Sequence, residues 1–249
     1  LGVIPTNSKK PYDMREVVAR LVDGSEFDEF KSELDSQTVC GRGHVFGRVC
    51  GFVGNNGPIT AKGAGKAAQF IGLCEQTRTP VVFLHNTTGF MVGTEAEHSG
   101  IIRQGAKMIQ AVANATVPKI SFVIGGSFGA GNYAMCGRGF DPRFIFSWPN
   151  ARTAVMGGEQ AGKVLRLIAE EKTRKSGQTI DDTKMSALEA KTAEQLDKSS
   201  TALFSTAHLW DDGLIDPRDT RKVLGFVLDT CEEAEARRLQ SISFGVPRH

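Results

Sequence analysis

The sequence predicts a layered α/β fold. Three stretches, which start near Pro80, Val117 and Phe144, repeat one order along the chain: a short apolar run, a glycine-rich turn and a helix. Such apolar runs are typical of strands that are buried on both faces of a parallel sheet. The 249 residues, 40% of them hydrophobic, suffice for one large domain with a sizeable core. We expect the loops that follow the strands to gather at one sheet edge, where ligands bind.

Composition excludes several classes of protein. The formal net charge is only +2 and the basic residues are scattered, so we expect no nucleic-acid partner. There is no secretory signal and no apolar run long enough for a bilayer, so we expect no membrane partner and an intracellular location. The five cysteines show no C-x-x-C spacing, which favours reduced, buried thiols. Because the chain starts at Leu1 rather than at a methionine, we expect a piece of a longer polypeptide.

The first eighty residues predict a helix, a hairpin and a second helix. Helical spacing runs from Met14 to Val22, and Phe27–Phe30 predicts a short amphipathic turn. Residues 45–53 alternate in polarity and carry two glycines, as a strand or hairpin does, and a turn follows at residues 55–58. From Gly65 to Gln76 the pattern is helical again.

The next two units place two loops after two strands. The buried strand at residues 80–84 runs into a loop at 85–93, and a helix is expected at 98–115. Its expected apolar face comprises Ile101, Ile102, Met108, Ile109 and Val112. A second buried strand at 120–124 leads into glycine-rich residues, after which a helix is expected to open at Asn132.

The third unit and the remainder are mainly helical. Residues 144–150 predict a strand, and a helix should run through Ile168. Residues 171–198 predict a long solvated helix or a helix pair, with a connection near Gly177. A turn-rich segment with one buried aromatic residue is expected at 207–217. The last predicted element is an amphipathic helix at 219–238, with Val223, Phe226 and Val227 facing inward.

The glycine-rich segment from Gly125 to Gly131 is open to three interpretations. Between a strand and a helix, its backbone N–H groups could hold an anion or an oxyanion that forms during a reaction. The glycines could instead serve only close packing. Thirdly, the segment fits the G-x-S-x-G nucleophile elbow, in which Ser127 would attack. That hydrolase would need a histidine further along the chain, which leaves His208 and His249, and an acid such as Asp141, Asp181 or Asp182.

Several motifs recur together in the order that is typical of one family. They are Asn55-Asn-Gly57, Asn86-Thr-Thr-Gly-Phe-Met-Val-Gly93, Gly105-Ala-Lys-Met108, Val117-Pro-Lys119, Gly125-Gly-Ser-Phe-Gly-Ala-Gly-Asn-Tyr-Ala-Met-Cys-Gly-Arg138, Pro142-Arg-Phe144, Trp148-Pro-Asn-Ala-Arg152 and Val155-Met-Gly-Gly-Glu-Gln-Ala161. The sequence thereby resembles the carboxyltransferase β subunit of biotin-dependent acyl-CoA carboxylases, in the methylcrotonyl-CoA and geranyl-CoA carboxylase branch. Residues 58–60, Phe128 and Ala134 favour the geranyl type.

The resemblance implies a fold and a domain organisation. It spans the whole chain but only the C-terminal half of such a subunit. The implied fold is the α/β crotonase-like superhelix of β-β-α units, which the ClpP and crotonase enzymes share. Residues 1–249 would then form a single biotin-binding carboxyltransferase domain, without the N-terminal domain that binds acyl-CoA, and this domain alone should be inactive.

The resemblance also implies the reaction and its partners. Carboxybiotin, carried on a biotin carboxylase/biotin carrier α subunit, gives up carbon dioxide, and the resulting ureido enolate deprotonates an unsaturated branched acyl-CoA. ATP is needed only at the partner subunit, and no metal is needed here. Such subunits pair as dimers of domains within a larger ring, in the bacterial cytoplasm or the mitochondrial matrix. The alternatives are the Ser127 hydrolase, another crotonase-fold acyl-CoA enzyme, or a non-catalytic scaffold.

Carried over by position, the resemblance assigns the site. The backbone N–H groups of Ala130 and Gly131 should hold the ureido oxygen of biotin, and Tyr133 should face the acyl group. The remaining biotin-binding residues are expected to be Gly89, Phe90, Met91, Val92, Gly129 and Asn132. Ser127 would then be only a turn residue.

Overall fold

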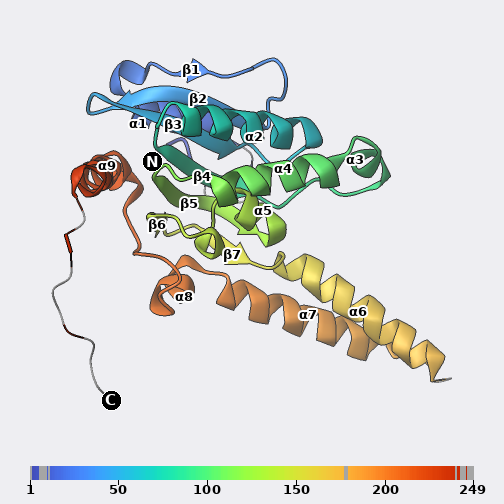
Figure 1. The fold of residues 1–249 in the computed structure, drawn as a ribbon. Helices are drawn as coiled ribbons and strands as arrows, with labels where there is room; N and C mark the ends of the chain where they lie inside the picture. The colour runs from blue at the N-terminus through green and yellow to red at the C-terminus, as the bar shows by residue number, and fades with distance from the viewer. Residues whose placement is uncertain are drawn as a thin grey trace.

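The fold is a seven-stranded sheet with helices on both faces and a helical hairpin that projects from one end (Figure 1). The computed structural model describes residues 2–5, 10, 12–176, 179–238, 240–241 and 245. The strands in order across the sheet are β1 (Asp28–Glu29), β2 (Thr38–Val45), β3 (Arg48–Asn55), β4 (Val81–Thr87), β5 (Lys119–Phe128) and β6 (Phe144–Ser147), and β7 (Arg152–Ala154) pairs with the far end of β5.

The sheet is antiparallel at one side and parallel at the other. Strands β1, β2 and β3 pair antiparallel, whereas β3, β4, β5 and β6 run parallel. The hairpin expected at residues 45–53 is confirmed as the β2–β3 pair, and its turn is fixed by Asp23. The Asp23 carboxylate accepts hydrogen bonds from the backbone N–H groups of Phe46 (3.0 Å) and Gly47 (2.7 Å).

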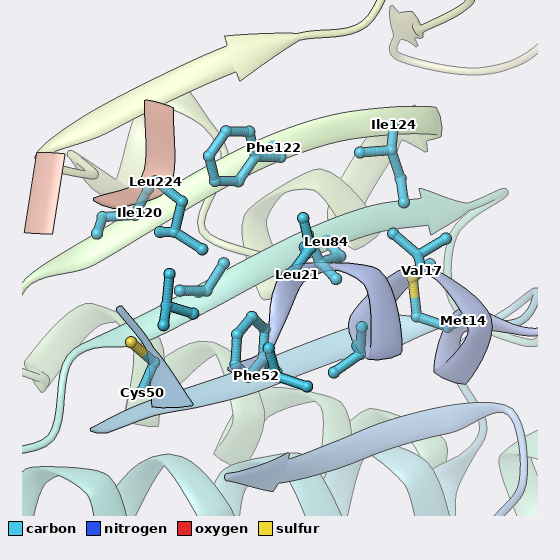
Figure 2. Packing of buried hydrophobic residues seen from close by; sticks show 14 of the residues in the cluster. Met14, Val17, Leu21, Cys50, Phe52, Leu84, Ile120, Phe122, Ile124 and Leu224 are labelled. Carbon is cyan, nitrogen blue, oxygen red and sulfur yellow. The ribbon is translucent and has the colours of Figure 1, made fainter. Parts of the chain in front are cut away.

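One face of the sheet is covered by the first and last long helices. These are α1 (Met14–Leu21) and α9 (Thr220–Ala236), which share a core with the sheet. Figure 2 shows Leu21 of α1 beside Phe52 and Leu84 of the sheet. The two helices are joined directly, because the Arg221 guanidinium donates to the carbonyl oxygen of Leu21 at 2.8 Å.

The other face is covered by α2 (Ala61–Gln76), α4 (Ile101–Asn114) and the short α5 (Gly129–Ala134). Val53 and Phe83 point to this side, whereas their chain neighbours Phe52 and Leu84 point to the other. This two-sided burial is why the central strands are continuous apolar runs. The Thr60 hydroxyl caps α2 by accepting from the N–H of Gly63 at 2.9 Å.

The projecting hairpin consists of α6 (Gly158–Lys175) and α7 (Asp182–Ser199) (Figure 1). Of the two alternatives expected for residues 171–198, the helix pair is therefore the one observed, but residues 171–175 continue the helix that was expected through Ile168. Gly177, the expected connection, lies outside the described residues. Near the base the helices meet closely, since a Cβ on Gly162 would lie 2.6 Å from the carbonyl oxygen of Glu189. Further out, Arg166 of α6 pairs with Asp182 (2.5 Å) and Glu189 (3.5 Å) of α7. The short helix α8 (Ala202–Ala207) follows.

Two expected elements differ in the structure. The helix predicted at 98–115 is α4, which starts at Ile101, because Gly100, whose φ of +82° is not helical, separates it from the short helix α3 (Thr94–His98). The amphipathic turn at Phe27–Phe30 contains the two-residue strand β1, because these residues find a pairing partner in β2.

Three expected inward-facing side chains point outward. Ile102 and Phe226 are 76% and 70% exposed, and Trp210 is 47% exposed, so the prediction of a buried aromatic at 207–217 is wrong. On α9, Leu224, Val227 and Leu228 face the sheet, and a residue two positions after Leu224 points well away from that face. Among the described residues, none of the helices combines the length and the apolar character of a membrane span.

Candidate functional site

Most of the glycine-rich segment is strand rather than turn. The expected turn from Gly125 to Gly131 is wrong for its first four residues, which belong to β5. They extend the strand because two partners reach them: Gly126, Ser127 and Phe128 pair with β7, and Ser127 also pairs with Thr87 of β4. The turn therefore contracts to Gly129, whose φ of +53° suits a residue without a side chain.

Helix α5 starts at Gly129, three residues earlier than expected, and presents unpaired N–H groups. Ala130 and Gly131 are the second and third residues of α5, where backbone N–H groups lack acceptors within the helix. The cap residue Phe128 has no acceptor in its side chain, so the side chain at this position does not cap the N–H groups of α5. Ala130 is exposed and Gly131 is buried. These two donors lie at the carboxyl end of a parallel strand, the edge at which the sequence places the site.

Backbone segments approach one another closely around these donors. A Cβ on Gly131 would lie 2.8 Å from the Cα of Gly89, and one on Gly129 would lie 2.9 Å from the carbonyl oxygen of Val155. The loops after β4, β5 and β7 thus meet at α5, and the glycines leave room for this meeting.

The loop after β4 is anchored to the chain after β3. Ile59 donates from its N–H to the carbonyl oxygen of Gly89 and accepts from the N–H of Met91, both at 2.9 Å. The Phe90 ring packs against α4, where a Cβ on Gly105 would be 3.0 Å from it. The partly buried ring therefore packs against the core at α4. Val92 is 84% exposed.

An apolar cavity of about 370 Å³ lies beside this loop. It is lined by Phe90, Met91, Val92, Glu97, Ile101, Ile102, Gly105, Ala106 and Ile109. The exposed Ile102, expected in the core, instead contributes to this cavity.

The two remaining expected residues lie on α5. Tyr133 is half-exposed, and its ring packs on Phe140 with centroids 5.5 Å apart. Asn132 points inward, and its Nδ2 donates to Ser127 Oγ at 2.8 Å. The expected site residues therefore lie in two adjacent segments, one after β4 and one after β5.

A histidine that the sequence analysis missed lies beneath the site. His85 is fully buried at the end of β4, and its Nδ1 is 2.9 Å from Ser127 Oγ. Burial lowers the pKa of His85 from 6.5 to about 3, while the backbone of Met135 acts in the opposite direction. A signal was present in the sequence, because His85 immediately follows the apolar run at 80–84, where site residues are expected.

The geometry does not favour the hydrolase. Ser127 is fully buried, so no substrate reaches its hydroxyl. Of the two candidate bases, His249 lies outside the described residues, and His208 is exposed at the end of α8 and stacks on Phe204 with ring centroids 4.1 Å apart. The histidine that does contact Ser127 has too low a pKa to act as a general base near neutral pH.

Cysteine and metal chemistry receive no support from the described residues. All five cysteines are free and buried, as the sequence predicted, and burial raises the pKa of Cys136 to about 12. No group of three or more His, Cys, Asp or Glu side chains among the described residues is arranged to hold a metal ion.

Comparison with known proteins gives consistent results. Residues 1–242 match the carboxyl transferase domain family. The chain is 48% identical to the mitochondrial methylcrotonoyl-CoA carboxylase beta chain of Arabidopsis thaliana over 99% of its length, and 47% identical to the probable Drosophila melanogaster counterpart. It covers 42% of each of these relatives, so it spans less than half of their length.

Two solved structures are also similar. The beta subunit of P. aeruginosa geranyl-CoA carboxylase superposes with a TM-score of 0.93 at 65% identity, covering 100% of this chain and 47% of that one. A chain of the transcarboxylase 12S crystal structure superposes with a TM-score of 0.82 at 33% identity, covering 98% of this chain and 46% of that one.

Proposed function

The chain belongs to the carboxyl transferase domain family and has its crotonase-like fold, and from this premise we propose that it is the biotin-binding part of an acyl-CoA carboxylase β subunit. The activity would be the carboxyltransferase half-reaction of a carbon–carbon bond-forming ligase. The observation that carries this proposal is the uncapped start of α5, where the N–H groups of Ala130 and Gly131 follow the positive-φ Gly129.

The substrate we propose is an unsaturated, branched acyl-CoA. Geranyl-CoA is the first choice, because identity is 65% to a geranyl-CoA carboxylase beta subunit and 47 to 48% to methylcrotonoyl-CoA carboxylase beta chains. 3-Methylcrotonyl-CoA is the second choice. The same comparison supports the preference for the geranyl type drawn from Phe128 and Ala134.

The residues present fit a biotin ureido group. Biotin on a partner's carrier domain would supply the carboxyl group and, once that group is released, the base. The N–H groups of Ala130 and Gly131 would donate to the ureido oxygen, and fixed donors of this kind stabilise negative charge most where water is excluded. Gly89, Gly129 and Gly131 have no side chains, which allows the backbone segments around the proposed biotin site to lie as close together as they do. Tyr133 would stand on the acyl side.

The partners follow from the relatives. We propose two partners: a biotin-bearing α subunit, at which ATP is used, and further copies of the β subunit in a homo-oligomer. In the β subunit, acyl-CoA would bind to the region that corresponds to the part of the relatives outside the match with this chain. By itself the chain would then not carboxylate an acyl-CoA. The expected location is the cytoplasm in a bacterium and the mitochondrial matrix in a eukaryote, where the relatives named above are mitochondrial.

Replacing Ala130 with proline tests the assignment of the donors. In the parent β subunit, reconstituted with its biotin-bearing partner, Ala130→Pro removes one N–H and should lower turnover of geranyl-CoA or 3-methylcrotonyl-CoA by about 10²- to 10³-fold. Ala130→Gly keeps the N–H and serves as the matched control, and thermal melting shows whether each variant is folded. A folded Ala130→Pro enzyme with normal turnover would rule out this position for the oxyanion site.

A further inference from the structure

Three polar side chains, two of them fully buried, form a series of hydrogen bonds beneath the proposed donors. Asn132 Nδ2 donates to Ser127 Oγ at 2.8 Å, and Ser127 Oγ lies 2.9 Å from His85 Nδ1. His85 and Ser127 are both 0% exposed. They come from three elements: His85 from β4, Ser127 from β5 and Asn132 from α5.

The chemistry of Asn132 and Ser127 fixes the direction of one of these hydrogen bonds. The amide nitrogen of Asn132 can only donate, so Ser127 Oγ accepts from it. The hydroxyl keeps one hydrogen and a second lone pair, so it pairs with Nδ1 of His85 in either tautomer of the neutral imidazole. Burial without a neighbouring charge favours the same neutral state and lowers the pKa of His85 to about 3.

These hydrogen bonds link the two segments that form the proposed site, the loop after β4 and the start of α5. His85 lies four positions before Gly89 in the loop after β4, and Asn132 immediately follows Gly131, the second proposed donor. Ser127 joins them across the start of α5. A change at His85 would thus be felt at both the donors and the wall that faces them, although His85 cannot touch a ligand itself.

We propose that His85 is a positioning residue that holds the α5 donors in register with the loop after β4, acting through Ser127 and Asn132. The inference rests on the proposed function, since it assigns a role in aligning donors for the biotin oxygen. Misplacement of reacting groups by about 1 Å can cost about 10²-fold in rate. The expected effect of losing the His85 contact is accordingly on kcat, with little change in KM for the acyl-CoA, which binds elsewhere.

The neighbouring strand offers a matched control. Asn55 on β3 occupies the position equivalent to that of His85 on β4. Each immediately follows one member of the residue pair Gly54 and Leu84, which are partners in the sheet. Asn55 is also fully buried, but neither of its side-chain polar atoms has a hydrogen-bond partner in the described part of the chain. It is therefore a buried polar residue next to the His85 strand that is not linked to α5.

The test uses the parent β subunit reconstituted with its biotin-bearing partner. His85→Leu removes the hydrogen-bond partner of Ser127, while His85→Asn keeps one, because the Oδ1 and Nδ2 atoms of asparagine are two bonds from Cβ as Nδ1 is. We expect His85→Leu to lower kcat by about 10- to 100-fold with KM for acyl-CoA unchanged. His85→Asn and Asn55→Leu should retain nearly normal kcat. Ser127→Ala should lose as much as His85→Leu, and the double variant should lose no more than either, since the two act as one unit.

Hydrogen exchange at the amides of Met135 and Gly137, which donate to the carbonyl oxygens of Gly131 and Asn132 at 3.0 and 2.8 Å, gives a second readout that needs no catalysis. Exchange should quicken in His85→Leu by about tenfold, the effect of losing one hydrogen bond, and not in His85→Asn. Normal kcat and normal exchange in a folded His85→Leu enzyme would overturn the proposal, as would equal losses in the Leu and Asn variants. If the unmodified enzyme carboxylates neither acyl-CoA, the proposed function fails, and exchange alone then decides the role of His85.

Discussion

The edge of the sheet around α5 and the α6–α7 hairpin use the same backbone device for different ends. In both places a glycine lets two backbones meet: Gly131 faces Gly89 at the edge, and Gly162 faces Glu189 in the hairpin. At the edge the meeting fixes where N–H donors point. In the hairpin it fixes only the distance between two helices. An identical substitution at the two glycines should therefore have different consequences, which makes the comparison testable.

The two regions also differ in how polar groups are stabilised. Beneath α5 they are uncharged and linked side chain to side chain, from the fully buried His85 and Ser127 to the partly buried Asn132. In the hairpin Arg166 is partly exposed and pairs with carboxylates, among them Glu170 at 2.7 Å. Lower pH, higher salt concentration and substitutions should therefore have different effects on the uncharged region beneath α5 and on the charged hairpin.

Acid should have the largest effect, through His85. The pKa of His85 is about 3 in the folded chain and near 6.5 when exposed, so the unfolded chain binds more protons between these values. The free energy of unfolding should therefore fall as the pH drops from 6.5 towards 3, by about 2 kcal/mol at pH 5 and about 5 kcal/mol in all. Denaturant unfolding at pH 7, 6 and 5 measures this contribution. His85→Asn should lack it, and equal slopes for both proteins would contradict the assignment.

Gly131→Ala should have the next largest effect, on rate. The added Cβ would lie 2.8 Å from the Cα of Gly89, a backbone atom that cannot turn aside, so the donor or the facing loop must shift. Turnover in the reconstituted enzyme should fall by about 10- to 100-fold. The melting temperature should change little in comparison with turnover, because the helix propensity of alanine offsets part of the strain. Wild-type turnover would mean that this backbone contact does not align the site.

Gly162→Ala is the counterpart in the hairpin and should affect stability alone. Its Cβ would lie 2.6 Å from the carbonyl oxygen of Glu189, so α6 and α7 must move apart. Overpacking of about 1 to 3 kcal/mol is partly offset by the helix propensity of alanine, which leaves a loss of about 1 kcal/mol. Calorimetry checks this loss, and turnover should be unchanged. A fall in turnover like that of Gly131→Ala would remove the distinction between the two regions.

Arg166→Met should have the smallest effect. Methionine keeps the apolar stem and removes the ion pairs with Glu170, Asp182 and Glu189. Because Arg166 is 28% exposed, the loss in unfolding free energy should stay below about 1 kcal/mol. It should shrink further in 1 M salt, where charges are screened over about 3 Å. A loss that is independent of salt would point to packing instead.

The sequence predicted the central strands well, because burial on both faces leaves a continuous apolar run at residues 80–84 and 120–124. It predicted the end of β5 several residues too early. Ser127 and its neighbours have the composition of a turn, yet they extend β5 because β7 pairs with them. A partner that lies some 25 residues further along the chain has no local signature at Ser127. Pairing between distant segments therefore overrode the local preference.

Side-chain roles were harder to predict than elements. The family resemblance assigned Ala130, Gly131 and the loop after β4, and the structure places these residues in adjacent segments. It did not indicate His85, whose role depends on a contact with Ser127 that spans 42 positions. The outward positions of Ile102 and Phe226 were missed because apolar periodicity identifies a face without showing how much of it a neighbour covers.

The pairing of α1 with α9 has a consequence for biosynthesis. One face of the sheet, with Leu84 and Phe122, is covered in part by a helix that starts at Thr220, about a hundred residues after Phe122. A ribosome that adds about 5 to 20 residues per second needs roughly 5 to 20 s to extend the chain from Phe122 to α9. During that interval the nascent sheet exposes an apolar surface, so its handling by a ribosome-associated chaperone would matter most before α9 emerges.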